Sequence, residues 1–444
     1  MSEISVARTL ARFLEKISCD TLDTEIISRA KNLILDALGC SVGGIEEECS
    51  RIALRVIETN RGDCTVFGMG IKAPLQDAAF ANAVSTNALS LDDFLYTFHP
   101  GTINVPTAFA IAEKEGLSGS ELIGSIVAGY EVMGRMYLGG PTIAPKFRAT
   151  SVYGPFGTTV TAGKLYQFDE ELLMKGICYA ANFGSGLTQC WLNGTLEGYF
   201  HPGMSARDGI LAASLVKEKA RAAEFTLEGR QGFYLAYAGN MDEIGAVTAD
   251  LGSKYMIMNA SFKQYPICAL LQIPIDFIEK LKKQHNISAK KVSNIVIEVS
   301  EWDANFPGSN YDGPFENVGQ TLLSSQFCTA AALLNHPVWA YDFYPKNFSD
   351  PDIAALAKKI KLVGKEGREF PLITVNMEDG ETYRMEADEQ TDSLIPTPEK
   401  THDKFMNLTT GFLGEERAKE IVDMVSRLEE IADIRELTGK FIKD

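Results

Sequence analysis

Two adjacent carboxylates and a histidine lie close together in the stretch SLDDFLYTFHPGT, residues 90–102. Asp92 and Asp93 precede His99, in a chain that contains only five histidines. Histidine is the side chain best suited to exchange a proton near neutral pH, because its unperturbed pKa is about 6.5. The stretch predicts either an acid–base site with His99 as the proton carrier, or a structural network in which these groups cap a helix and a buried loop.

Asp92 and Asp93 are expected to have different roles. Neighbouring residues of a helix project in different directions, so at most one of the two carboxylates should face a site. The other would then cap a helix or bind a neighbouring residue. The residue types alone leave function and capping evenly balanced for the pair.

Three further residues, which a family resemblance of the motifs around them singles out, could complete such a site. Arg148 keeps its charge at any working pH, so it is a poor base but a strong clamp for a carboxylate. Lys263 could hold a carboxylate and, if desolvated, could also lose a proton. Cys268 could act as an acid or base if its pKa were lowered, or it could simply fill apolar space. An ordinary surface position is the competing interpretation for Arg148 and Lys263.

Composition excludes several classes of partner. A formal net charge of −17 argues against nucleic acid as a partner, because proteins that bind nucleic acid usually have a basic face. The eight cysteines are scattered without a Cys-x-x-Cys pair, and we expect them to be reduced. The segment GMGIKA, residues 68–73, lacks the third glycine of a dinucleotide-binding loop. We therefore expect no metal and no organic cofactor.

The protein is expected to be cytoplasmic and not to enter a membrane. The first residues, MSEIS, have no basic segment followed by an apolar run. No apolar stretch approaches the ~20 residues that span a bilayer.

Periodicity predicts helices over almost all of residues 5–260. The segment 24–44 repeats apolar residues at helical spacing and should end at Gly43–Gly44. Four further segments mix small and large apolar residues, which predicts helices buried on both faces. They are residues 75–91, 119–136, 158–168 and 209–224.

The pattern changes after about residue 290. Residues 292–302 alternate apolar and polar side chains, and residues 371–387 predict a hairpin that turns at Asp379–Gly380. A helical run at 321–334 lies between them, and the polar segment 388–405 reads as a linker. Helical periodicity then returns, so the C-terminal helices should pack on the first domain.

Six motifs together resemble the MmgE/PrpD family, whose members include dehydratases, decarboxylases and epimerases of small acids. The resemblance covers nearly the whole chain. The motifs are AKNLILDALGCSVGG, NALSLDD followed by HPGTINVP, FRATSVYGPFGTTVTAGKLYQFD, HPGMSARDGI, FKQYPICAL and SSQFCTAAAL.

The resemblance implies a mainly α fold with two domains. A large all-α domain would comprise residues 1–263 and 396–444, and a smaller α+β lid domain would comprise residues 264–395. The resemblance also implies a homodimer, a site between the domains, a small di- or tricarboxylic acid as substrate, and no cofactor.

The resemblance assigns roles residue by residue. His99 matches a His-Pro element in the active-site cleft. Asp92 and Asp93 match the last two acids of the family's Asp-aromatic-Asp-Asp run, and Ser90 replaces the first acid of that run. Arg148 stands where the family commonly has histidine. The predicted catalytic residues are His99, Lys263, Asp93 and Cys268, and the predicted substrate-binding residues are Arg148, Asp92, Tyr153, His201 and Arg207.

Some other positions match the family, and some depart from it. Lys263 matches a lysine at the domain boundary, whereas Cys268 and Gly198 replace a histidine and a lysine. His201 and Arg207 match the family. The alternative interpretations are a structural role for His201 and an ion pair for Arg207.

The predicted function is that of a lyase that takes a proton next to a carboxylate. The alternatives are an epimerase or isomerase of a small dicarboxylate, and a repurposed protein that binds a metabolite without catalysis. Sequence does not decide whether Cys268, Tyr153 or Asp93 supplies the second proton-transfer group.

Overall fold

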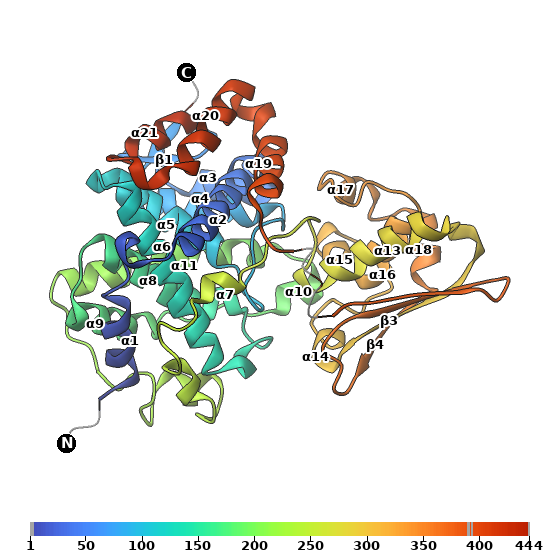
Figure 1. Cartoon of the computed structure of the whole chain (residues 1–444), viewed down its shortest axis with the longest axis horizontal. Helices are drawn as coiled ribbons and strands as arrows, with labels where there is room; N and C mark the ends of the chain where they lie inside the picture. The colour runs from blue at the N-terminus through green and yellow to red at the C-terminus, as the bar shows by residue number, and fades with distance from the viewer. Residues whose placement is uncertain (1–3, 389–390, 392–393, 443–444) are drawn as a thin grey trace. The chain divides into compact units, whose positions relative to one another are not determined.

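The chain folds into two compact units, each with its own hydrophobic core. The structure is a computed structural model that describes residues 4–388, 391 and 394–442. The mainly α fold predicted from the sequence is confirmed (Figure 1). The helical unit comprises Met1–Leu187, Glu197–Phe262 and Pro396–Asp444, and the α+β unit comprises Thr188–Leu196 and Lys263–Ile395.

The helical unit is built from closely packed helices. In its interior α8 packs on α6 and α11, and α11 packs on α4. Every residue of α4 from Ala78 to Ala88 is buried, as the mixture of small and large apolar residues predicted. The helices are α1 (Val6–Leu14), α2 (Thr24–Gly43), α3 (Glu48–Val56), α4 (Leu75–Ala88), α5 (Pro100–Glu115), α6 (Gly119–Leu138), α7 (Ala149–Val152), α8 (Gly154–Leu165), α9 (Glu170–Ala180), α11 (Glu197–Lys217), α12 (Phe233–Tyr237), α19 (Pro398–Leu413), α20 (Glu415–Ser426) and α21 (Arg435–Thr438).

Segments from both ends of the chain lie side by side in this unit. The C-terminal helix α19 packs along α2, as Figure 1 shows by its red and blue ribbons. At Gly39 an added Cβ would lie 3.1 Å from the Phe405 ring, so the small residue allows this close approach. None of the described helices combines the length and apolar character that crossing a bilayer requires.

Two local predictions for the helical unit are wrong. The antiparallel strands β1 (Cys64–Val66) and β2 (Ile71–Ala73) interrupt the expected helical pattern. The helix expected over residues 209–224 ends at Lys217. Lys219 has a φ of 67°, and the Ala220 N–H donates to the Leu215 carbonyl, so a left-handed residue closes the helix.

The α+β unit contains a four-stranded sheet in the order β4-β3-β5-β6. The predicted hairpin is confirmed as β5 (Leu372–Met377) paired with β6 (Thr382–Glu386), with Gly380 at φ 92° in the turn. The predicted first strand is β3 (Val292–Ser300). Strand β4 (Ile360–Lys365) was not predicted, and it pairs in parallel with β3.

Helices of the α+β unit pack against this sheet and one another. The helix expected over residues 321–334 is divided at Ser324, whose side chain accepts from the Phe327 N–H and starts a second helix. The helices are α10 (Gln189–Asn193), α13 (Gln272–His285), α14 (Glu301–Ala304), α15 (Val318–Leu323), α16 (Ser325–Leu333), α17 (Phe343–Asn347) and α18 (Pro351–Ala357).

Helix α10 belongs to the α+β unit although the neighbouring segments of the chain belong to the helical unit. The Trp191 and Phe306 rings have centroids 5.1 Å apart, and the Asn317 amide donates to the Asn193 carbonyl. The predicted linker, residues 388–405, includes 389, 390, 392 and 393, which lie outside the described residues. Its last part is helical because α19 begins at Pro398.

Candidate functional site

Asp92, Asp93 and His99 lie in a loop that joins α4 to α5, and not on a helix as the spacing argument assumed. Phe94 and Ser261 exchange two backbone hydrogen bonds of 2.8 Å, which fasten the loop to a distant segment of the helical unit. The His99 backbone N–H also donates to the Thr150 hydroxyl at 3.2 Å. The loop is therefore fixed by contacts with other parts of the unit.

The buried carboxylate of Asp92 and the partly buried imidazole of His99 form an acid–imidazole pair. His99 Nδ1 lies 3.0 Å from Asp92 Oδ2 and 2.9 Å from the Asp93 carbonyl oxygen. Because both neighbours accept hydrogen bonds, we assign the hydrogen of the neutral imidazole to Nδ1. Nε2 then has the lone pair, as a general base requires.

The Asp92 carboxylate receives further hydrogen bonds within the helical unit. Its side chain is fully buried. The Asn87 amide donates to both carboxylate oxygens at 3.2 Å, and the Thr102 hydroxyl donates to Oδ2. These donors offset the loss of water around a buried carboxylate and hold it toward His99.

Asp93 turns to the start of α5. Its Oδ1 accepts from the Gly101 N–H at 3.0 Å, and its Oδ2 accepts from the Tyr130 hydroxyl at 2.7 Å. Burial, reinforced by the charge of Asp36, raises the pKa of Asp93 well above its usual value. Asp93 thus has a helix-capping arrangement, whereas Asp92 contacts the imidazole.

Arg148 is buried at the start of α7 and bonds to three other segments. Its NH2 group donates to Asn87 Oδ1 at 2.8 Å, and its NH1 group donates to the Gly198 carbonyl. Its backbone N–H donates to the Gly186 carbonyl at 2.8 Å. The guanidinium group therefore lies beside the amide that contacts Asp92.

His201 lies on α11 near Arg148. Burial and the Arg148 charge lower the pKa of His201 to about 4, so its imidazole is neutral at pH 7. His201 Nδ1 and Ser151 Oγ are buried without a hydrogen-bond partner among the residues that the structure describes. A Cβ added at Gly186 would meet both, at 3.2 and 2.7 Å.

Lys404 reaches the same loop from the C-terminal helix α19. Its Nζ lies 2.5 Å from Asp36 Oδ1 on α2, and it donates to the Leu91 carbonyl at 2.5 Å. The charges of Asp36, Cys40 and Asp92 raise the pKa of Lys404 despite the opposing effect of its burial. Lys404 therefore supports the backbone directly before Asp92.

Two predicted site residues of the helical unit make other contacts. The buried Tyr153 hydroxyl donates to the Gly140 carbonyl at 2.5 Å, and burial raises the pKa of Tyr153. Arg207 is half exposed on α11 and forms a 3.6 Å ion pair with Asp77. Neither contact joins the hydrogen-bond network around Asp92.

Lys263 and Cys268 belong to the α+β unit. Lys263 is 3% exposed, and Cys268 is partly buried. Burial raises the pKa of the Cys268 thiol, while Lys263 opposes the shift. The thiol is thus protonated at neutral pH and is not a ready thiolate nucleophile or base.

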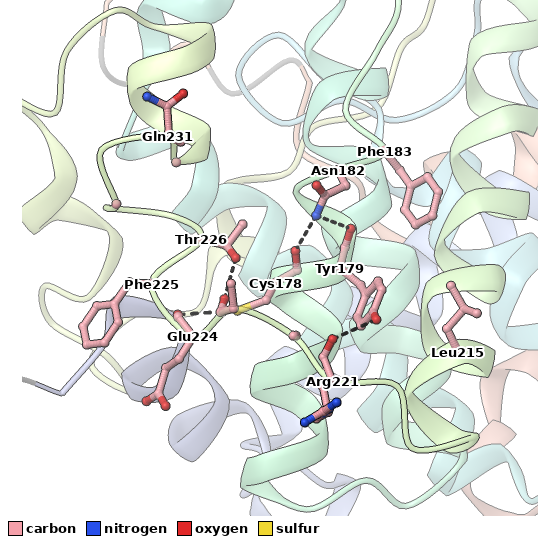
Figure 2. Close-up of a pocket in the computed structure, with 14 residues that line it drawn as sticks. Cys178, Tyr179, Asn182, Phe183, Leu215, Arg221, Glu224, Phe225, Thr226 and Gln231 are labelled. Carbon is pink, nitrogen blue, oxygen red and sulfur yellow. Dashed lines mark hydrogen bonds between the residues drawn. The ribbon is translucent and has the colours of Figure 1, made fainter.

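An open groove of about 680 Å³ in the helical unit contains none of the predicted site residues (Figure 2). The Tyr179 hydroxyl donates to the Arg221 carbonyl there, and the Asn182 amide donates to the carbonyls of Cys178 and Tyr179. Separately, no three His, Cys, Asp or Glu side chains of the described chain are grouped so that they could hold a metal ion.

Four residues that were not predicted support the loop: Asn87 and Thr102 bond to Asp92, Lys404 bonds to the Leu91 carbonyl, and Asp36 pairs with Lys404. Asn87 and Thr102 lie within the motifs NALSLDD and HPGT, so their nearness to Asp92 and His99 was an available signal. Asp36 and Lys404 are far apart in the sequence and gave no local signal. Packing of α19 on α2 brings them to the loop.

Comparison with known proteins identifies the family. The model of the MmgE/PrpD N-terminal domain matches residues 8–243, and that of the MmgE/PrpD C-terminal domain matches residues 265–430. Cis-aconitate decarboxylase of Aspergillus terreus strain NIH 2624 is 24% identical, over 97% of this chain and 95% of the relative. Human cis-aconitate decarboxylase is 23% identical, over 98% of this chain and 94% of the relative. The cis-aconitate decarboxylase-like protein oryM of Aspergillus oryzae is 23% identical, over 98% of this chain and 97% of the relative. Because the two domain models match in order and together cover most of its length, the chain belongs to the MmgE/PrpD family.

Proposed function

We propose that this protein is a lyase that acts beside a carboxylate of a small di- or tricarboxylic acid, with His99 as its proton carrier. The observation that carries the proposal is the Asp92–His99 pair, in which Nδ1 of the partly buried imidazole lies 3.0 Å from the buried Asp92 carboxylate. An imidazole oriented by a carboxylate is a common acid–base unit of enzymes.

The same nitrogen of His99 serves both reactions expected of such a lyase. In an elimination, neutral Nε2 takes the proton α to the carboxylate, and the electron pair expels the leaving group from the neighbouring carbon. In a decarboxylation, loss of CO₂ leaves an electron pair on carbon, and protonated His99 donates its Nε2 hydrogen to that carbon. Both reactions develop negative charge that a cation must stabilise.

Lys263 is the proposed cation. It is nearly fully buried in the α+β unit, where a charge interacts more strongly than in water. The proposal further includes an α+β unit that acts as a lid and no requirement for a metal or organic cofactor.

The relatives favour decarboxylation as the first reaction to test, because those compared above are named for cis-aconitate decarboxylation. The chain departs from the family at Ser90, Arg148, Gly198 and Cys268. For this reason the experiment also tests two alternative functions, an epimerase and a protein that binds metabolites without catalysis. An epimerase would need a second acid on the opposite face of the substrate, for which the protonated Cys268 thiol is a candidate. A protein that binds metabolites without catalysis would show binding and no turnover.

The test is turnover of cis-aconitate and a panel of small di- and tricarboxylic acids in D₂O, followed by NMR. We expect product formation: a decarboxylation should leave solvent deuterium on the carbon that His99 protonates, and an elimination should release the α hydrogen of the substrate to the solvent. His99→Gln should lower kcat about 10²- to 10⁴-fold, since the acid–base group is lost. Added chelator should leave the rate unchanged.

His402→Gln is the matched control. His402 also lies beside an aspartate, 3.1 Å from Asp403, but this pair is exposed on α19. The control should retain the wild-type rate. Deuterium exchange at the wild-type rate in His99→Gln would refute the assignment of His99, and thermal stabilisation by an acid without turnover would favour the binding protein.

A further inference from the structure

We propose that Arg148 is a positioning residue that orients the Asp92–His99 pair through the amide of Asn87. The inference rests on the proposed role of His99 and assigns Arg148 a different role from the carboxylate clamp expected from the sequence. It concerns a position where this chain departs from its family.

A continuous path of hydrogen bonds connects the guanidinium group to the imidazole. Arg148 NH2 donates to Asn87 Oδ1 at 2.8 Å, and Asn87 Nδ2 donates to both Asp92 oxygens at 3.2 Å. Asp92 Oδ2 lies 3.0 Å from His99 Nδ1. The exposed fractions of Arg148, Asn87 and Asp92 are 6%, 4% and 0%, so solvent hardly competes along the path.

The chemistry of arginine determines which way the Asn87 amide points. Arginine has five N–H donors and no acceptor, so the amide oxygen must face it. The NH₂ group of the same amide then faces the opposite side, where the Asp92 carboxylate accepts. Rotating the amide by half a turn would oppose donor to donor and oxygen to carboxylate.

The guanidinium group is itself held in place. The backbone N–H of Arg148 donates to the Gly186 carbonyl, and its NH1 group donates to the Gly198 carbonyl. Turning it toward a substrate would break buried hydrogen bonds, and each buried partner left unsatisfied costs about 1–3 kcal/mol. These contacts favour a fixed supporting group over a mobile clamp.

A nitrogen-15 spectrum of the histidine side chains tests the inference without any substrate. The chain has five histidines, so the spectrum of His99→Gln identifies the His99 signals. The wild type should show the Nδ1–H tautomer of His99. In Arg148→Lys and in Asn87→Leu, the Nε2–H tautomer should gain population, because the Asp92 carboxylate is no longer held toward Nδ1 and only the Asp93 carbonyl still accepts there.

Arg135→Lys is the control for a buried arginine. Arg135 is 3% exposed and bonds to Glu131 on the same helix at 2.9 Å. This change should lower stability and leave the His99 tautomer unaltered. An unaltered His99 tautomer in both Arg148→Lys and Asn87→Leu would overturn the inference, and Asn87→Leu decides it if Arg148→Lys does not fold.

Kinetics with the substrate found in the panel separate positioning from clamping. Misplacing a reacting group by about 1 Å can cost about 10²-fold, so both variants should lower kcat by up to that factor with KM within twofold of wild type. The double variant should be no worse than the poorer single variant, because both changes interrupt one path. A clamp would instead raise KM, and this result would overturn the inference.

The two proposals fail in distinguishable ways. If His99→Gln retains the wild-type rate, the proposed function fails while the tautomer measurement still decides the role of Arg148. If His99→Gln is inactive and both Arg148→Lys and Asn87→Leu keep the tautomer and kcat, only the inference about Arg148 fails.

Discussion

His201 should give the protein a distinct dependence of stability on pH. Its pKa is about 4 in the folded protein, against about 6.5 in an unfolded chain, because burial and Arg148 disfavour the imidazolium. Between these values the unfolded chain binds more protons, so this contribution is complete above pH 6.5 and is lost as the pH falls toward 4. At pH 5 the loss relative to pH 7 is at most about 2 kcal/mol.

The measurement is urea unfolding of the wild type and His201→Asn at pH 7 and pH 5. The variant should lose less stability than the wild type between the two pH values, since its side chain does not titrate. Equal losses in the two proteins would show that His201 does not carry this dependence.

Gly101 illustrates how little space surrounds the loop. A Cβ at this position would lie against Asp93 Oδ1 and 2.6 Å from the Tyr130 hydroxyl oxygen. Alanine gains about 1 kcal/mol over glycine in a helix, whereas overpacking typically costs about 1–3 kcal/mol. We expect Gly101→Ala to lower the free energy of unfolding and, by moving Asp93, to lower activity.

Gly411→Ala provides the matched control for this change, measured by urea unfolding. Gly411 also lies in a helix, but an added Cβ meets no atom within 4 Å. Alanine there should stabilise the protein by up to about 1 kcal/mol. A stable, fully active Gly101→Ala variant would contradict the proposed crowding.

At the scale of elements, α19 holds both α2 and the loop through Lys404. Removing one partner of a buried ion pair typically costs about 3–5 kcal/mol, because the other charge is left buried and unpaired. Lys404→Met should therefore lower the free energy of unfolding by about that amount, as measured with urea. The double variant Asp36→Leu/Lys404→Met should recover much of the loss, since no buried charge of the pair is left. A double variant as unstable as the single one would show that the bond to Leu91 matters more.

At the scale of the molecule, we expect a homodimer. The family resemblance suggests it, and α11 has the exposed apolar side chains of Met204, Leu211 and Leu215, which a partner chain would cover. Light scattering should give a mass about twice the 48.6 kDa of the chain. A mass of 48.6 kDa that does not change with concentration would contradict the expectation.

The sequence by itself determined the features that neighbouring residues encode. The turn at Asp379–Gly380 follows from local backbone preferences, and the burial of α4 follows from its small side chains. Helix α2 also ends at the predicted Gly43–Gly44, although Gly44 keeps a φ of −88°. Six motifs along the chain, taken together, also predicted the family, which the matching domain models confirm.

Only the tertiary structure decided features that depend on residues distant in the chain. Asp92 and Asp93 are alike in the sequence, but they lie in a loop that Ser261 and Thr150 hold in place. In this loop Asp92 lies beside His99, whereas Asp93 accepts from the distant Tyr130 hydroxyl. Strand β4 pairs with β3 across a long connection, and α10 joins the α+β unit through contacts with residues more than 100 positions away. Arg148 bonds to Asn87 and Gly198, which lie 61 and 50 positions away in the sequence. Such contacts depend on which surfaces meet during packing, and local periodicity does not encode that information.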